Sequence, residues 1–365
     1  MLSPQKVNCP QTNRMFLSAI LLLVMIALVS LPAAAQRATP TNLTSDIPNV
    51  GTFNDTNLVN PWGLIASPVG PWWISDNGTG LSTLYDGTGS PKALVVTIPS
   101  GSGSGSGSPT GIALNSTSDF KINGSAAVFI YATEDGTISG WSSGTSAVIA
   151  VNNSGSGNAV YKGLALGSAN GNNYLYVANF RNGTVDVFDK NYASFSFGAG
   201  SFVDATIPSG FAPFNVVNLG NNQLAVTYAK QDGAKHDDVK GPGNGYVTIF
   251  DTSGNLKFRL THLPYLNSTW AVVMAPASGF GGFSGDILVG QFGSGAIVAY
   301  TPAGSFVGLL LDPAFLHLEI DGLWGLGFGN GTQSGPKTTL YFTAGAFGEA
   351  HGILGNITCC IQGPR

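Results

Sequence analysis

Side chains suited to metal binding or acid–base chemistry are sparse in this chain of 365 residues, which contains 19 acidic residues and four histidines. Three of the histidines, His236, His317 and His351, lie in polar segments, and imidazole is a common ligand of transition metals. Four carboxylates lie in similar segments: Asp76, Glu134, Asp321 and Glu349. Carboxylate oxygens suit a hard cation such as Ca²⁺. The sequence therefore allows either kind of metal site, although the spacing of these residues matches no metal-binding motif.

Eleven polar residues form the candidate ligand-binding set, because the repeat pattern described below assigns them to a single face of the molecule. They are Asn60, Asp76, Asn77, Glu134, Arg181, His236, Asp237, Gln291, Asp321, Glu349 and His351. Polar groups that converge on one opening are typical of a binding site. The alternative is that Asn and Asp occur in these segments because they form turns.

The most charged segment of the chain is Lys230–Lys240, and the glycine-rich stretch Gly241–Gly245 follows it. A long irregular loop in a compact domain is often a lid or a binding loop. We expect this insertion to lie over or beside a central mouth, where it would bring His236 and Asp237 close to other candidate residues. These predicted neighbours are Asp321, Glu349 and His351. A solvated insertion with no part in binding is the alternative.

Signatures of familiar enzyme classes are missing from the sequence. There is no Gly-x-Ser-x-Gly elbow, no His-Glu-x-x-His pair and no phosphate-binding Gly-x-x-x-x-Gly-Lys loop. The net charge of −4 and the charged fraction of 9% also argue against a nucleic-acid partner, which requires a basic surface. The sequence therefore favours a binding protein over an enzyme.

The elements that position these residues follow a repeat. Six short apolar segments begin at residues 62, 111, 163, 214, 270 and 324, at intervals of 49, 52, 51, 56 and 54 residues. Within each repeat, stretches of β-branched and aromatic residues alternate with Gly, Asn and Asp, which is typical of short strands and turns. A period of about 40–50 residues built from strands is characteristic of propeller blades. We therefore predict an all-β fold, a six-bladed β-propeller with four-stranded blades.

The order of strands in a blade assigns each loop to a face. The connection into the first strand and the turn between the second and third strands share one face, which we call the top face; the other two turns share the bottom face. The sixth repeat ends after its third strand, whereas Leu43–Ile47 precede the first repeat and have the pattern of a fourth strand. We therefore predict that the ring is closed by this N-terminal strand, which completes the last blade.

The two ends of the chain differ from the repeats. Residues 1–35 have the pattern of a secretory signal peptide, because Lys6 and Arg14 precede the apolar run Met15–Leu31 and three alanines end at Ala35. An uncleaved membrane anchor is the alternative, and no later apolar stretch is long enough to span a bilayer. Cleavage changes the net charge from −4 to −6, because two basic residues and no acidic residue are lost.

The predicted domains are the signal peptide, 1–35, the propeller, 36–358, and a C-terminal tail, 359–365. The tail contains Cys359 and Cys360, the two cysteines that remain after cleavage. A strained vicinal bridge, pairing with another molecule and a tail without a function are the alternatives for them. The predicted location of the mature chain is secreted or periplasmic.

Two regions of the chain resemble a family of exported bacterial proteins. They are Asn60-Pro61-Trp62-Gly63-Leu64 with the following Trp73–Tyr85, and Tyr341–Gly345 with Glu349-Ala350-His351-Gly352. The resemblance covers essentially the whole mature chain, and more distantly the blades resemble NHL-repeat propellers. It implies a propeller fold and export, but no established activity, so no catalytic residue is carried over. Lactonases and strictosidine synthase-like proteins share the six-bladed plan, but their metal ligands do not map onto this chain.

The combined prediction is a non-enzymatic binding or interaction module. Its partner would be a small molecule, a glycan or a protein, with no nucleic acid and no membrane span after signal cleavage. The alternative is a metal-dependent, lactonase-like hydrolase whose site lies at the top-face mouth and holds Ca²⁺ or a transition metal.

Overall fold

The computed structural model describes residues 36–155 and 158–359. The predicted signal peptide and residues 360–365 lie outside the described residues, so the predictions for the signal peptide and for Cys360 are not tested. Strands dominate the described residues, and their helical structure is a single 3-10 turn, η1 (Gly281–Phe283). The predicted all-β fold is confirmed. No helix in the described part is long and apolar enough to cross a bilayer.

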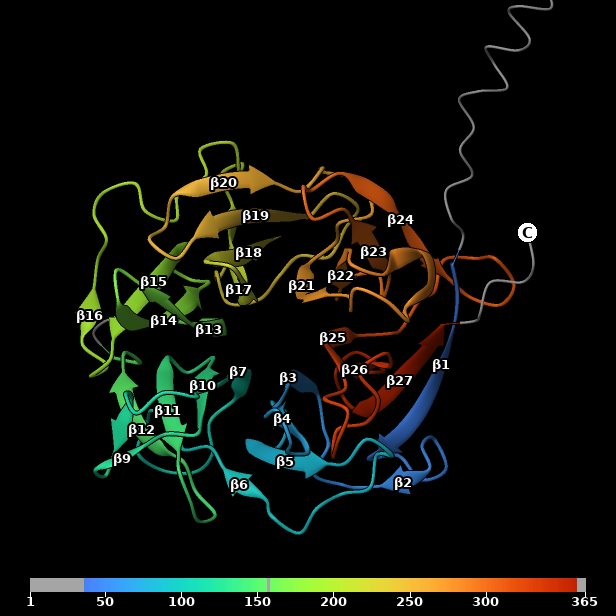
Figure 1. The fold of residues 1–365 in the computed structure, drawn as a ribbon. Coiled ribbons are helices and arrows are strands. Elements are labelled where there is room, and N and C mark those ends of the chain that lie inside the picture. The colour runs from blue at the N-terminus through green and yellow to red at the C-terminus, as the bar shows by residue number, and fades with distance from the viewer. Residues whose placement is uncertain (1–35, 156–157, 360–365) are drawn as a thin grey trace, which may run out of the picture. The chain divides into compact units, whose positions relative to one another are not determined.

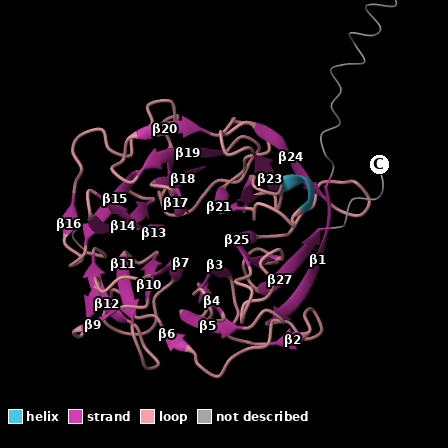
Figure 2. Cartoon of the chain, in the orientation of Figure 1, coloured by secondary structure: helices cyan, strands magenta, loops and turns pink. Residues whose placement is uncertain are grey.

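Four sheets of four strands are arranged around a central axis (Figure 1). In each of them the first strand of a repeat is the innermost and later strands follow outward (Figure 2). From the axis outward, the first sheet is β3 (Pro61–Ala66), β4 (Trp72–Asp76), β5 (Leu81–Tyr85) and β6 (Val96–Thr97), and the second is β7 (Pro109–Leu114), β10 (Phe129–Thr133), β11 (Thr137–Trp141) and β12 (Val148–Asn152). The third sheet is β13 (Tyr161–Ala169), β14 (Asn172–Asn179), β15 (Thr184–Asp189) and β16 (Ser194–Phe195). The fourth is β17 (Phe211–Gly220), β18 (Gln223–Lys230), β19 (Gly245–Asp251) and β20 (Leu256–Arg259). A small hairpin, β8 (Lys121–Ile122) with β9 (Ser125–Ala126), stands apart from them.

The remaining strands form one nine-stranded sheet, which contains the fifth and sixth repeats. Eight of its strands follow the order β21 (Thr269–Met274), β22 (Ile287–Gln291), β23 (Ile297–Tyr300), β24 (Phe306–Leu311), β1 (Gln36–Ser45), β27 (Ile353–Cys359), β26 (Leu340–Ala344) and β25 (Leu323–Phe328). The ninth, β2 (Phe53–Asn54), pairs with β1. The first strands of both repeats, β21 and β25, are therefore the two ends of this sheet. The arrangement is that of a propeller.

The N-terminal strand β1 pairs with the third strand of the sixth repeat. Its antiparallel register with β27 runs from Ala38↔Cys359 to Ser45↔Ile353. The predicted pairing of the N-terminus with the last repeat is confirmed, but the strand is longer than predicted and Ile47 lies beyond its end. Asp46 fixes this end of the strand, since its carboxylate accepts a hydrogen bond of 2.8 Å from the Gly352 backbone N–H.

Glycines in several innermost strands allow neighbouring strands to approach closely. A Cβ atom on Gly63 would lie 2.8 Å from the carbonyl oxygen of Thr110 in the next repeat. A Cβ atom on Gly163 would lie 1.6 Å from Oδ1 of Asn215. Only glycine permits such contacts, so these positions are required for the narrow centre of the ring.

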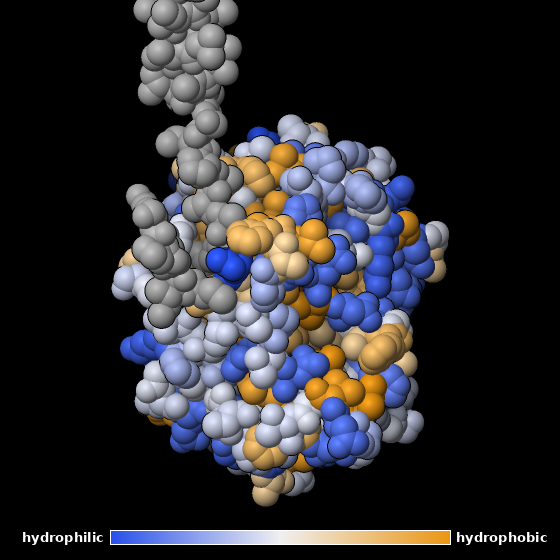
Figure 3. All heavy atoms as spheres, turned by 90° about the vertical axis from the view of Figure 1, so that its right-hand side faces the viewer, coloured by the Kyte–Doolittle hydropathy of each residue, from blue (hydrophilic) through white to orange (hydrophobic). Residues whose placement is uncertain are grey.

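The outer surface mixes polar and apolar residues. Figure 3 shows, on the side of the molecule that carries β1 and β24, hydrophilic residues interspersed with small apolar groups. Because only 9% of the residues are charged, uncharged polar side chains supply much of this hydrophilic surface. This agrees with a chain that relies on Ser, Thr and Asn for its solubility.

Candidate functional site

One residue near the start of each innermost strand contributes a side chain to the centre of the ring. These six equivalent residues are Trp62, Thr110, Lys162, Phe214, Trp270 and Trp324. The ring of Trp62 stacks on Trp324 at 3.7 Å and meets Trp270 edge-on at 5.0 Å between centroids. Phe292 stacks on the other side of Trp324 at 3.6 Å. Since these residues come from different repeats, their contact closes the channel at this level; we call this group the aromatic plug.

Lys162 occupies a plug position that most other repeats fill with an aromatic residue. Its side chain is only 1% exposed. Its Nζ lies 4.9 Å from the ring centroid of Trp62, 5.7 Å from Phe180 and 6.0 Å from Phe214. Cation–π contacts of this kind are favourable, yet a buried ammonium also needs an opposite charge.

Two carboxylates from other repeats supply that charge. Glu134, in the turn between β10 and β11, forms an ion pair with Lys162 through Oε1. Asp237, in the insertion between β18 and β19, places Oδ1 3.6 Å from Lys162 Nζ. His236 Nδ1 lies 2.9 Å from the same oxygen of Asp237. The mouth therefore joins charged groups from the second, third and fourth repeats.

A chain of amides extends this group to the sixth repeat. Asn77 donates from Nδ2 to Glu134 Oε2 at 2.8 Å, and its own Oδ1 accepts from Asn60 Nδ2 at 3.3 Å. The same Asn60 amide donates to Glu349 Oε2 at 3.0 Å. On its other side, Asn60 Oδ1 accepts a hydrogen bond of 2.9 Å from the indole N–H of Trp324. The aromatic plug is therefore linked by hydrogen bonds to the polar side chains of the mouth.

The insertion Lys230–Lys240 lies against this mouth, as expected from the strand order. Within it, the Asp232 N–H donates to the Asp237 carbonyl and the Val239 N–H to the Lys230 carbonyl, both at 2.8 Å. At the end of the insertion, Lys240 contacts the plug, and its Nζ lies 3.9 Å from the ring centroid of Phe292. The insertion is therefore held both internally and onto the plug.

The acids of the mouth differ in their affinity for protons. Burial acts to raise the pKa of Asp237, but the charge of Lys162 and the hydrogen bond with His236 outweigh it and lower that pKa. Burial raises the pKa of Glu349, and the hydrogen bond from Asn60 offsets this only in part. Burial also raises the pKa of Asp238. Asp237 is therefore the most readily ionised of these three carboxylates.

The three histidines that the sequence allowed as metal ligands are not grouped, because His351 and His317 have other partners than His236. His351 Nδ1 lies 2.7 Å from Asp46 Oδ2, a residue of the N-terminal segment. His317 packs against the ring of Tyr265 at 5.5 Å. Among the described residues, one set of potential ligands comes together: Glu134, His236 and Asp237, with one ligand atom of each within 4.8 Å of the others. Its two carboxylates are the partners of Lys162.

Four other candidate residues lie outside the bonded chain at the mouth. Asp76 is fully buried in β4, accepts from Thr83 Oγ1 at 2.7 Å, and has a pKa well above its usual range because of that burial. Gln291 accepts from Thr269 Oγ1 at 2.7 Å, and Arg181 donates to Asn158 Oδ1 at 2.6 Å. Asp321 accepts from the Phe347 N–H at 2.8 Å. Each of these contacts supports a turn or a strand. Asp76 and Asp321 therefore do not join the other carboxylates that the sequence suggested for a hard cation.

Lys162 is the central residue of the mouth, and the sequence analysis missed it. Lys162 precedes Gly163 just as Trp62 precedes Gly63 and Trp324 precedes Gly325. Alignment of the repeats would have shown a lysine in a column of aromatic residues. That departure was the signal for a buried charge at the axis.

A ring of sheets whose first strands face a common axis defines the class of β-propeller proteins. Virginiamycin B lyase from Staphylococcus aureus shares the fold, with a TM-score of 0.51 and 10% identity, and the match covers 88% of this chain and 99% of that one. A protein of unknown function from Bacteroides thetaiotaomicron shares it as well, with a TM-score of 0.54 and 10% identity, and that match covers 89% of this chain and 76% of the other. At these identities the likeness shows the fold alone.

Sequence relatives define the family. An uncharacterised protein of Acanthamoeba polyphaga mimivirus is 32% identical over 332 residues, which cover 86% of this chain and 78% of that protein. A second one from the same virus is 31% identical over 317 residues, covering 83% and 81%. The chain belongs to the family of these proteins. No protein-family model matches the sequence. These relatives are viral, whereas the sequence analysis named a bacterial family.

Proposed function

We propose that the protein is an exported binding module built on a six-bladed propeller. The nine-stranded sheet is interpreted as two blades, because β24 and β1 share only two residue pairs, Gln36↔Leu310 and Arg37↔Leu311. With the four separate sheets this gives six blades, the last completed by β1. The proposed domain limits are the signal peptide at 1–35, the propeller at 36–358 and the tail at 359–365.

The proposal of export is supported by the sequence pattern of residues 1–35. A secreted or periplasmic location follows from it. The low charge content favours a small molecule, a glycan or a protein as the partner over a nucleic acid.

The proposed ligand-contacting surface is the top mouth. The observation that carries this proposal is the insertion Lys230–Lys240, which is bonded internally and to the plug while 65% of the Asp237 side chain stays exposed. Holding eleven residues of a polar loop in place costs conformational entropy. A loop that is held at a channel mouth with charged groups facing solvent is suited to recognition. The surface comprises Asn60, Asn77, Glu134, His236, Asp237 and Glu349.

A screen of the mature chain against glycans and small molecules tests this proposal. Any ligand found is measured again with a variant in which Lys230–Lys240 is replaced by a short Gly-Ser turn. We expect a nearly unchanged melting temperature and affinity weakened about tenfold or more. Asp237→Asn should weaken binding in the same direction, whereas Asp189→Asn, in the bottom turn between β15 and β16, should not. Equal affinity in the shortened protein would reduce the insertion to a solvated loop.

A metal-dependent, lactonase-like hydrolase is the second candidate function, and the grouping of Glu134, His236 and Asp237 supports it. A divalent cation at this position would have to displace the ammonium of Lys162, which already contacts both carboxylates. Metal analysis of the purified protein, followed by a lactone and ester panel with and without chelator, separates the two functions. Stoichiometric metal and turnover that the chelator abolishes would establish the hydrolase and reject the binding-only proposal.

A further inference from the structure

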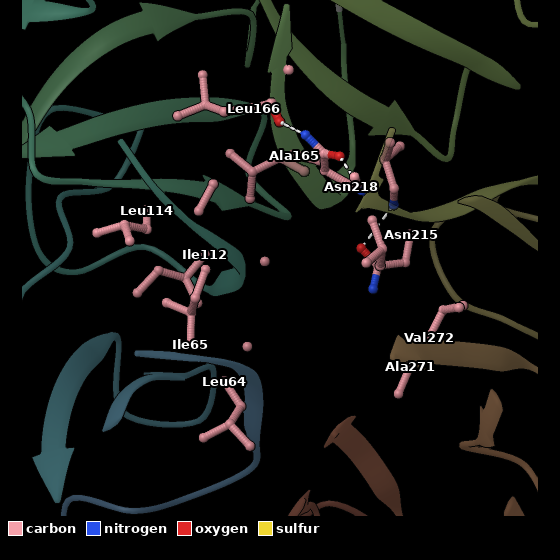
Figure 4. A pocket seen from close by; sticks show the side chains of 18 of the residues that line it. Leu64, Ile65, Ile112, Leu114, Ala165, Leu166, Asn215, Asn218, Ala271 and Val272 are labelled. Atoms are coloured by element: carbon pink, nitrogen blue, oxygen red, sulfur yellow. Dashed lines mark hydrogen bonds between the residues drawn. The ribbon is translucent and has the colours of Figure 1, made fainter. Parts of the chain in front are cut away.

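A cavity of about 660 Å³ lies along the axis on the side of the plug away from the insertion. In every innermost strand, the residue two positions after the one at the centre of the ring contributes to the wall: Leu64, Ile112, Leu164, Val216, Val272 and Leu326. Figure 4 shows aliphatic side chains from several blades around the open centre. Trp270 of the plug lines it as well, and Thr117 and Asn221 belong to turns that leave the innermost strands on the bottom face. The cavity is thus distinct from the top mouth. Its volume is in the range of small-molecule sites.

The wall of this cavity carries no ionisable side chain. The residues that line it are Gly, Ala, Val, Leu, Ile, Trp, Ser, Thr and Asn. A charged ligand would lose its hydration and find no counter-charge here, so its binding is disfavoured. The cavity therefore selects against ions and excludes acid–base catalysis by its own side chains.

Two amides of the wall, those of Asn215 and Asn218, are already engaged within the protein. Asn215 donates to the Trp270 carbonyl at 3.1 Å and accepts from the Val216 N–H at 2.8 Å. Asn218 donates to the Leu166 carbonyl at 2.7 Å and accepts from the Gly220 N–H at 2.8 Å. Figure 4 shows both amides at the edge of the cavity, with the bond from Asn218 to Leu166 drawn as a dashed line. A ligand rich in polar groups would have to compete with these bonds.

The backbone leaves some capacity for hydrogen bonds. Each innermost strand is the terminal strand of its sheet order, so one of its edges has no strand partner. Side chains already bond some C=O groups of these strands, such as those of Leu166 and Trp270, and the edge groups without such a partner are open to a ligand. The cavity therefore suits a molecule with an apolar body and a few neutral polar groups, such as a hydroxyl, an ester or an amide.

We propose that this bottom-face cavity binds one neutral small molecule per chain, with an apolar body against the aliphatic wall and neutral polar groups toward the rest of the lining. The site is independent of the proposed top-mouth surface and needs no metal. The six aliphatic wall residues would contact the apolar body of the ligand. The ligand is expected to be neutral because the wall carries no ionisable side chain.

The neutral fluorescent probe N-phenyl-1-naphthylamine tests the proposal with the intact mature protein. We expect its emission to rise and saturate at one probe per chain, with energy transfer from Trp270 and the adjoining tryptophans. Asn218→Phe places a ring at the edge of the cavity and Leu166→Gln makes its wall polar; each should weaken binding about tenfold. Met274→Phe is the matched control, because Met274 holds the position of Asn218 and Leu166 in the fifth repeat but does not line the cavity.

Competition defines the ligand class. A neutral medium-chain alcohol should displace the probe at a concentration about tenfold lower than the carboxylate of the same chain length. Equal displacement by the carboxylate would overturn the assignment of a neutral ligand. Probe binding that does not saturate, or that is the same in Asn218→Phe, Leu166→Gln and Met274→Phe, would overturn the site itself. Melting curves of the three variants identify any that is not folded.

Discussion

The Nζ of Lys162 lies 4.9 Å from the ring centroid of Trp62, and both are the second residue of an innermost strand. A lysine at a position that is aromatic in four of the other five repeats thus places one positive charge among aromatic side chains. That charge explains why Glu134 and Asp237 converge from other repeats. The geometry of the top mouth is therefore organised around a buried cation and not around a metal-binding motif.

Replacing Lys162 with Met should lower the free energy of unfolding by about 3 kcal/mol, because Glu134 then loses its counter-charge in a site where its own side chain is 12% exposed. The double variant Lys162→Met/Glu134→Gln should recover much of that loss, since both charges are removed together. Denaturant unfolding of the wild type, both single variants and the double variant measures the coupling. A double variant no more stable than Lys162→Met would contradict the buried pair.

Deletion of residues 36–48 should lower the melting temperature strongly. It removes β1 and leaves both β24 and β27 with an unpaired edge in the middle of the nine-stranded sheet. Leu43→Ala is the graded comparison: it keeps the strand but removes a side chain that packs with Trp72 and Tyr341, at a cost of about 2–3 kcal/mol. If the truncated chain melts like the mature protein, β1 does not close the sheet in solution.

Much of the fold follows from local patterns. The six repeat segments coincide with the innermost strands, because a 49–56-residue period of apolar segments reports the blades directly. The pairing of β1 with β27 was predictable for a similar reason, since the sixth repeat lacks a fourth strand. The positions of Glu134, Asp237 and Glu349 at one mouth follow from the strand order alone.

Other features depend on packing that no local pattern encodes. His351 pairs with Asp46 because β1 brings the N-terminal segment beside the sixth repeat, and this separates His351 from His236. Asp76 resembles a surface ligand in sequence, yet its strand is buried on both faces. The bottom-face cavity depends on the level at which the aromatic plug closes the channel, which is set by contacts between repeats.

Asp204→Asn should destabilise the protein by about 2 kcal/mol at neutral pH. The Asp204 carboxylate accepts two hydrogen bonds of 2.6 Å from Arg259 and one of 2.8 Å from Thr248, and these hold its pKa well below the usual range although burial acts in the other direction. A lowered folded-state pKa gives stability that is present above the ordinary Asp pKa and is lost as pH falls. The difference between wild type and variant should therefore shrink in acid. Arg259→Lys, which keeps the charge but not the paired geometry, should lie between the two; if it matches the wild type, the fork geometry contributes nothing.

Glu349→Gln should change the pH dependence of stability in the opposite direction. Burial raises the pKa of Glu349 in the folded state, so the native protein binds this proton more tightly than the unfolded chain does. The resulting stability is fully present below the unfolded pKa, at about 4.3, and is lost as pH rises through the raised pKa. The free energy of unfolding of the wild type, measured relative to that of Glu349→Gln, should therefore fall as pH rises above the unfolded pKa and through the raised pKa. Glutamine is a suitable replacement because its amide oxygen still accepts from Asn60.

Asp237→Asn is the internal control for this measurement, because Lys162 and His236 overcome the effect of burial and lower the pKa of Asp237. Its contribution is present above the unfolded Asp pKa and is lost as pH falls. The two variants at one mouth should therefore give slopes of opposite sign when denaturant unfolding is repeated across the pH series. A flat difference for Glu349→Gln, or slopes of the same sign for both, would mean that these carboxylates do not share the environment of the Lys162 network.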